Sequence, residues 1–424
     1  MIRFLLSKLS YGCLVLVGVV VVVFFLFNLS PGDPVRNLVG ENASEQTINN
    51  MRRKFDLDLP LGKRFLLYAN SLSPVSIHST QNKESRAYFE PTEMSGIRCF
   101  SLSGDLALYL KWPYLKRSFI TDKSVSSILA EVLPGTIALA AVSIMLAMII
   151  GMIMGIIAAL EKDSFFDRLM LFLAALGMAG PSFFVAIIVA WIGAILWREK
   201  IDVSWLMIVG VVMIIPMLLL LHYSKLKIKT SKAKAIGYWL VTLVGLQLMV
   251  MFVFSRDSII RSTIGLPGTG LNMTGSLYSV DVWKGQYLDL RNMILPVITL
   301  MIRPLSVIVQ LMRSSLIDVM HQDFIRTARA KGISEYRVVV GHALRNALNP
   351  VITAVSGWFA SLLAGAIFVE FVFGWKGLGQ QMFTAIENQD LPVVMGGVIV
   401  IAFFFVIINI LVDMIYGWID PRVR

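Results

Sequence analysis

The residues whose types and spacing most suggest a specific task lie in a polar segment, 313–348, between two apolar runs. Within it, Asp323 precedes a short stretch that contains alanines, and Gly332 follows directly after a lysine. Aspartate is a common helix-capping residue, and a glycine after the last helical residue readily adopts the left-handed conformation that ends a helix. With Ser334 available to cap a second helix and Pro350 just beyond its expected end, the segment predicts two short helices that meet at a corner.

The first of these helices would present an apolar knob among basic side chains. Phe324 and Ile325 stand at its start, and Arg326, Arg329 and Lys331 follow. Such a knob is suited to a groove on a partner protein. The alternative is an ordinary basic amphipathic helix that lies on an anionic lipid surface.

Three further charged residues lie inside apolar runs, where charge is costly and is by default a functional candidate. Arg303 stands beside Pro304 in the middle of one run, and we expect it to face an aqueous channel or to pair with a carboxylate of a partner. Glu370 closes another run and is a candidate gate residue. Asp413 belongs to the last run, where the alternative to a role in the channel is that of an interfacial anchor near Arg422.

Other chemistry finds little support in the sequence. The closest approach to a phosphate-binding Gly-Lys-Ser/Thr motif is Gly62-Lys63, which arginine follows, so the chain is not expected to hydrolyse ATP by itself. Cys13 and Cys99 lie in segments of different character and predict neither a disulfide nor a metal site. We therefore predict no catalytic residue, no metal ligand and no cofactor bound by this chain.

The composition identifies the medium in which these residues work. Of 424 residues, 57% are hydrophobic and 15% charged, and the mean hydropathy is +0.74, which is too apolar for a water-soluble protein. The net charge of +11 resides in short loops, which disfavours nucleic-acid binding. A membrane span needs about 20 apolar residues. Eight segments qualify: 9–29, 132–160, 169–197, 203–221, 236–254, 293–312, 351–373 and 393–416.

Lysine and arginine set the expected orientation, because cytoplasmic loops retain them. With the N-terminus inside, the inside loops hold 17 of these residues and the short outside loops hold 7. Both termini are therefore expected on the cytoplasmic side of a cytoplasmic (inner) membrane. The loop 222–235 has five lysines and no acid, so its flanking spans would cross as a hairpin, 203–254, inserted into a six-span core.

These expectations divide the chain into parts. Residues 1–29 form an anchor helix, 30–125 an extracytoplasmic segment and 126–417 the transmembrane domain, before a cytoplasmic tail at 418–424. The extracytoplasmic segment would pack against the outer mouth of the channel or form a separate cap. Gly151 and Gly155 are spaced to let two helices approach closely.

The segment 313–348 resembles the EAA loop of type I ABC-transporter permeases, in which small residues precede a glycine. Here Arg326-Thr327-Ala328 replaces Glu-Ala-Ala, and Gly332 occupies the glycine position. This form is similar to that of the dipeptide/oligopeptide/nickel permease family, B-type subunit. Further stretches that resemble this family are 29–34, 55–65, 363–370, 377–379, 390–397, 409–413 and 420–424.

The resemblance implies an all-α integral membrane protein with a type I ABC importer core. It implies partners: a second homologous permease, two ATP-binding-cassette ATPase subunits that use ATP-Mg, an extracytoplasmic substrate-binding protein and membrane lipid. Di- or oligopeptides are the expected cargo, and nickel complexes are the second choice. A secondary transporter or a membrane enzyme is disfavoured, since neither internal repeats nor a nucleophile with a base is evident. The resemblance assigns ATPase coupling to a run of ten residues: Asp323, Phe324, Ile325, Arg326, Thr327, Ala328, Arg329, Ala330, Lys331 and Gly332.

Overall fold

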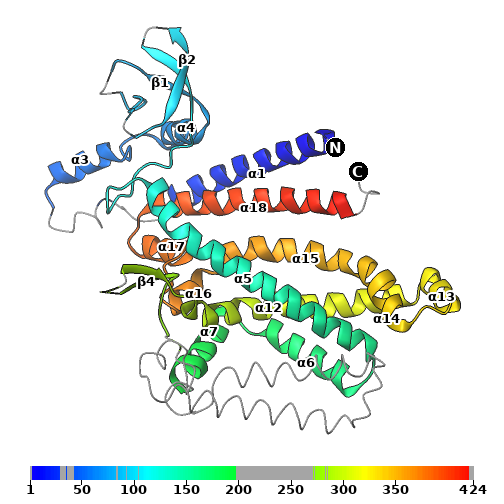
Figure 1. Ribbon diagram of the computed structural model, residues 1–424. Helices are drawn as coiled ribbons and strands as arrows, with labels where there is room; N and C mark the ends of the chain where they lie inside the picture. Colours follow the sequence, from blue (N-terminus) through cyan, green and yellow to red (C-terminus); the bar gives the residue numbers. More distant parts are fainter. Residues whose placement is uncertain are drawn as a thin grey trace. The chain divides into compact units, whose positions relative to one another are not determined.

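The computed structural model describes residues 2–28, 35, 43–82, 85–91, 93–103, 105–196, 271, 273–281, 283 and 285–419 (Figure 1). The expected hairpin 203–254, the stretch 29–34 and most of the tail 418–424 lie outside the described residues. The chain divides into two compact units, Met1–Pro134 with Gly377–Arg424 and Gly135–Lys376.

The first unit joins both ends of the chain. Its helices are α1 (Ile2–Asn28), α3 (Glu45–Lys54), α4 (Leu61–Leu72), α17 (Leu378–Glu387) and α18 (Leu391–Ile419). Helix α1 runs alongside α18, where Gly12 permits close approach, since a Cβ there would come within 2.5 Å of Val406 Cγ1 (Figure 1). Phe24 and Tyr68 meet Met395 in a buried cluster, which fixes α4 against the end of α1.

A three-stranded antiparallel sheet completes this unit. Its strands are β1 (Val75–Ser79), β2 (Gly96–Ser103) and β3 (Leu106–Lys111), in the order β1-β3-β2. On one side, β1 and β3 are buried, where Ala107 and Tyr109 pack with Phe89 and the Tyr109 and Phe89 rings stack at 4.1 Å. The strands differ from the all-α expectation, because the segment between α1 and α5 has alternating apolar residues that a membrane-span search does not detect.

Asp105 ties the turn between β2 and β3 to the end of β1. Its carboxylate accepts hydrogen bonds from the hydroxyls of Ser79 and Thr80 and from backbone N–H groups, including that of Asn82 at 3.1 Å. These donors favour the charged form and lower the pKa of Asp105 from 3.8 to about 2.

This carboxylate makes the stability of the sheet depend on pH. Because the folded pKa is depressed, the stabilisation is complete above the ordinary value of 3.8 and is lost as pH falls towards about 2. We expect Asp105→Asn to speed cleavage of the segment between α1 and α5 by proteinase K at pH 7. The variant and the wild type should differ much less in cleavage by pepsin at pH 2. Equal rates at pH 7 would contradict this role.

The second unit holds the remaining elements. After α5 (Val125–Leu160), which begins in the first unit, they are α6 (Phe165–Ala179), α7 (Ser182–Ala190), the π-helix η1 (Trp191–Leu196), β4 (Tyr278–Asp281), β5 (Gly285–Leu288), α12 (Arg291–Met320), α13 (Asp323–Ala330), α14 (Glu335–Arg337), the π-helix η2 (Val338–Ala343), α15 (Leu344–Gly365) and α16 (Ile367–Val372). Helix α12 contacts α6, α7 and α15 and is thus the centre of this unit.

The two glycines of α5 allow it to lie close to α12, as the sequence predicted. A Cβ at Gly151 would come within 2.8 Å of Ile308 Cγ2, and one at Gly155 within 2.6 Å of Met312 Cβ. These side chains are fully buried. A larger residue at either position would therefore force the helices apart.

Among the described residues, four helices are long and apolar enough to cross a membrane: α1, α5, α12 and α18. The expected span 169–197 is not one continuous helix, because α6 and α7 meet at a bend of 106°. Gly180-Pro181 lies at this break, where proline cannot continue the hydrogen-bond ladder of the preceding helix. The pair counts as a fifth span only if it is taken as one broken crossing. The total of eight spans remains a prediction.

Candidate coupling and translocation site

Helix α13 projects beyond the ends of α12 and α15 (Figure 1). Only His321 and Gln322 separate it from α12. Its N-cap is Gln322, which has an extended backbone, so the expected cap at Asp323 is wrong by one residue. Asp323 is instead the first helical residue, where its negative charge favours the positive end of the helix dipole.

The buried face of α13 consists of Ile325 and Ala328, three residues apart and therefore on one side of the helix. They join a cluster that contains Leu316 of α12, Val338 of η2 and Ala347 of α15. The predicted knob is therefore wrong for Ile325, which is fully buried and anchors α13 to its own unit. Of the two residues of the predicted knob, only Phe324 is available to a partner, with 38% of its surface exposed.

The opposite face of α13 is polar and open. Arg326 and Asp323 form a loose ion pair at 3.7 Å, with side chains 78% and 98% exposed. Thr327, Arg329, Ala330 and Lys331 are also exposed. A rigidly mounted helix with one face of this kind is suited to transmit movement from a partner that binds the exposed face.

Gly332 forms the corner, as predicted, with a φ of +73°. Its N–H donates to Arg329 O at 2.9 Å, and the N–H of Ile333 donates to Ala328 O at 3.4 Å. These two bonds are the Schellman pattern that ends helices at a left-handed glycine. Arg329 also pairs with Glu335 beyond the corner, with Nε and Oε1 2.9 Å apart. The pair, which the sequence did not reveal, fastens α13 to α14.

The second helix differs from the prediction at both ends. Ser334 occupies the N-cap position of α14 but makes no capping side-chain hydrogen bond. Pro350 does not follow the segment but lies inside α15. Ala347 and Val351 on either side of it are buried in the same cluster as Ile325, and this packing holds the helix together through the proline.

A nearly buried ion pair fastens α6 to α12. The carboxylate of Asp167 accepts both Nε and Nη2 of Arg313, the latter at 2.6 Å, and Asp167 is 1% exposed. The Ser164 hydroxyl accepts from the backbone N–H of Asp167 and caps the helix. No local signal could have identified the pair, because 146 residues separate its members.

We expect Asp167→Ala to lower the free energy of unfolding by about 3–5 kcal/mol, because it leaves the mostly buried Arg313 without its counter-charge. Asp323→Ala is the matched control, since it removes the same group from the exposed pair with Arg326 and should have little effect. Thermal unfolding of the detergent-purified protein would compare them. Equal melting temperatures for the two variants would contradict the role given to Asp167.

Arg303 lies near the middle of the 30-residue helix α12 and is exposed, whereas its neighbour Pro304 is buried against the other helices. Among the described residues, no carboxylate lies within ion-pair distance of Arg303. Its guanidinium is thus available to a group other than the carboxylates of the described residues.

Glu370 is fully buried in α16. Its Oε1 accepts a hydrogen bond from Thr136 Oγ1 at 2.6 Å, which ties α16 to α5. Arg303 makes no ion pair with it, so the structure does not bring these two candidates together. Asp413 belongs to α18 in the first unit.

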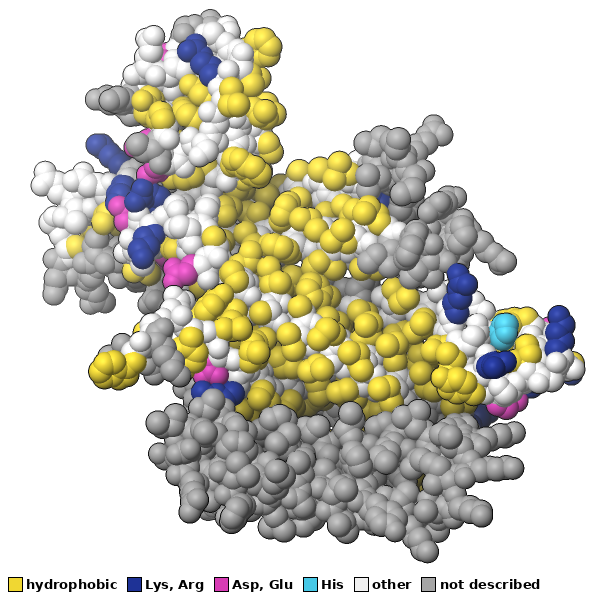
Figure 2. Space-filling view, in the orientation of Figure 1, with side chains coloured by type: hydrophobic (Ala, Val, Ile, Leu, Met, Phe, Trp, Pro, Cys, Tyr) yellow, Lys and Arg dark blue, Asp and Glu magenta, His cyan; other side chains and the backbone are white. Residues whose placement is uncertain are grey.

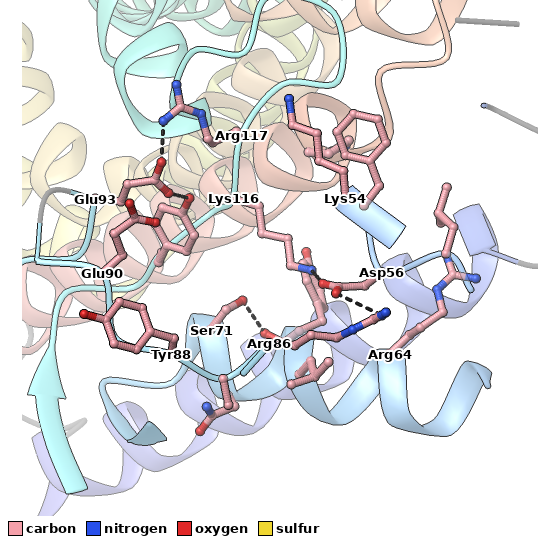
Figure 3. Close-up of a pocket in the computed structure, with 18 of the residues that line it drawn as sticks. Lys54, Asp56, Arg64, Ser71, Arg86, Tyr88, Glu90, Glu93, Lys116 and Arg117 are labelled. Atoms are coloured by element: carbon pink, nitrogen blue, oxygen red, sulfur yellow. Dashed lines mark hydrogen bonds and ion pairs between the residues drawn. The ribbon is translucent and has the colours of Figure 1, made fainter. Parts of the chain in front are cut away.

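The first unit contains a charged cavity of about 450 Å³, which sequence reasoning missed (Figure 3). Arg86 pairs with Asp58 at 2.6 Å, and Lys116 with Asp56 at 3.1 Å. Arg117 bonds to Glu93 on another wall. The Arg86 guanidinium lowers the pKa of Asp58, which keeps that carboxylate charged. The pairs made by Asp56 and Asp58 connect the residues that follow α3 to the loops around the sheet.

Comparison with known proteins identifies the class of the chain. Residues 151–424 match the family described as "Binding-protein-dependent transport system inner membrane component", and residues 1–84 match the N-terminal region of such membrane components. The dipeptide transport system permease protein DppB of Escherichia coli K12 is 30% identical over all of this chain and 99% of its own length. The DppB proteins of Alkalihalophilus pseudofirmus (dipeptide) and Pseudomonas aeruginosa (di/tripeptide) are each 29% identical, over all of this chain and 100% and 99% of their own lengths. The chain therefore belongs to the family of inner membrane components of binding-protein-dependent transport systems.

Proposed function

We propose that the chain is a permease subunit of an ATP-binding-cassette importer and forms half of a channel for di- or oligopeptides. Family membership supports the importer, and the names of the similar proteins support a peptide cargo. One observation supports the coupling role: one face of α13 packs against its own unit, and the other face is exposed.

Coupling by α13 would work as a rigid-body movement. Separate ATPase subunits would bind its open face and, on closing around ATP-Mg, displace it. The displacement would pass to α12 and α15, because Ile325 and Ala328 pack against the cluster that these helices share. The chain itself would bind no cofactor and would not act as an enzyme.

The remaining parts of the importer would lie around the channel. A second homologous permease would form the other half, and an extracytoplasmic substrate-binding protein would deliver the peptide. Both termini would lie in the cytoplasm, as the distribution of basic residues indicates. The hairpin 203–254 would be an insertion that leaves this orientation unchanged.

Arg303 is the best candidate for contact with the peptide inside the channel, because an exposed guanidinium near the middle of a membrane helix requires water or an anion beside it. We expect Arg303→Leu to reduce peptide uptake at least tenfold without loss of the assembled complex. Arg303→Lys keeps the charge and should retain part of the activity. Uptake by proteoliposomes would measure both, and normal uptake by Arg303→Leu would remove this residue from the path.

Glu370 and Asp413 would act differently from Arg303. The burial of Glu370 and its bond to Thr136 suit a gate held closed, which would open when α16 moves away from α5. Asp413 is proposed as a second residue of the path or its rim, on the basis of its place in α18.

The decisive experiment is purification through a tag on this chain, followed by measurement of ATP hydrolysis and of peptide transport. We expect an ATPase subunit to copurify and transport to require ATP. A single chain that transports peptides without ATP would overturn the proposal and favour a secondary transporter.

A further inference from the structure

One face of the sheet in the first unit is apolar and exposed. The strand register places Val75, Leu110 and Ile97 side by side across it, and Ile77 and Phe100 in the next row. Trp112 continues this side beyond β3 and lines one shallow hollow with Ile97 and Leu110. These six residues form what we call the outer face of the sheet.

The outer face has no second layer above it among the described residues. Ile97 is 72% exposed and Trp112 80%, and each of the other four exposes roughly half of its surface or more. The opposite side is buried at β1 and β3, where His78, Ala107 and Tyr109 lie under the unit's own loops, whereas residues 96–102 of β2 are exposed on both sides. Soluble proteins rarely leave such a contiguous apolar surface in water.

The direction of the outer face suggests what covers it. Within this unit, α1 runs away from the sheet towards the N-terminus (Figure 1). It is a candidate membrane span, and its side chains Leu14, Val17 and Val22 are exposed and available for contact with lipid. Hydrophobic side chains gather on the side of the sheet towards which α1 runs, and acidic and basic side chains are visible on the other side (Figure 2). The outer face thus continues the lipid-facing surface of α1.

We propose that the outer face of the sheet lies in the membrane interface, in the leaflet that α1 reaches at Asn28. The six side chains offer a partner almost no hydrogen bond, which suits acyl chains better than a protein surface with a polar rim. Trp112 supplies an aromatic body and one N–H, the combination that is enriched where lipid meets water. The sheet would therefore contact lipid through its outer face, and the charged cavity of the first unit would be open to water.

This inference rests on α1 being a membrane span and not on the cargo or on the coupling role. It follows that the segment between α1 and α5 lies at a fixed distance from the bilayer surface. The expected packing of this segment against the channel mouth would then involve surfaces other than the outer face.

Spin labels on neighbouring residues of β2 test the proposal. In a Cys13→Ser, Cys99→Ser background, Ile97→Cys labels the outer face, and Arg98→Cys, one residue further along the strand, labels the other side. The complex would be reconstituted in phospholipid nanodiscs and the labels exposed to oxygen, which enters lipid, and to a water-soluble nickel chelate.

We expect the label at position 97 to be relaxed more by oxygen than by nickel, and the label at position 98 to show the reverse. A label at position 97 that nickel reaches freely would overturn the proposal, since the face would then lie in water. A label at position 97 shielded from both reagents would also overturn it, because a protein would then cover the face.

Discussion

Replacement of Gly332 with valine is expected to abolish ATP-dependent peptide uptake while the complex still inserts into the membrane. The φ of +73° is strained for any residue with a Cβ, by about 1–2 kcal/mol, and more for a β-branched one. Relief of this strain would break the two backbone bonds that end α13 and turn its exposed face away from its partner. Uptake by proteoliposomes, together with ATP hydrolysis by the same preparation, measures the effect.

Gly341→Val is the matched control for this variant. Gly341 lies in η2 of the same segment and, like Gly332, has open space where a Cβ would stand, but it does not have a positive φ. The control should therefore retain uptake. If both variants transport normally, the corner at Gly332 has no part in coupling.

Ala328→Asp is expected to have an effect of similar size for another reason. Ala328 is 6% exposed and packs in the cluster shared by α12 and α15, so a carboxylate there would be buried without a partner, at a cost of several kcal/mol. We expect α13 to detach from the cluster, with loss of uptake and a lower melting temperature.

Ala330→Asp adds the same charge to an exposed position on the same helix. It should leave the melting temperature unchanged, whatever its effect on binding of an ATPase subunit. Equal melting temperatures for Ala328→Asp and Ala330→Asp would show that α13 is not anchored as described.

The sequence predicted the corner of the segment 313–348 correctly, because the signals for it are local. A glycine after a helical lysine requires no knowledge of the rest of the chain, and Gly332 has the predicted conformation. The direction of Ile325 was predicted wrongly, because it depends on where the ends of α12 and α15 lie. Amphipathicity alone shows that a helix has an apolar face, but not whether that face meets the same chain or a partner.

Long-range features left no trace in the sequence. Thr136 and Glu370 are 234 residues apart, and the walls of the charged cavity come from residues between Phe24 and Met395. The bend at Gly180-Pro181 did have a signal, since proline after glycine commonly marks a break. The apolar residues on both sides concealed it, because hydropathy registers the composition of a span but not its continuity.

The short link between α12 and α13 determines how much of a movement of α13 reaches α12. The two residues between these helices allow almost no independent movement, and the buried Ile325 opposes rotation of α13 relative to its unit. A displacement of α13 by an ATPase subunit would then reach α12 with little loss of amplitude. If ATPase subunits displace α13 as proposed, few ATP molecules would then be hydrolysed without movement of α12.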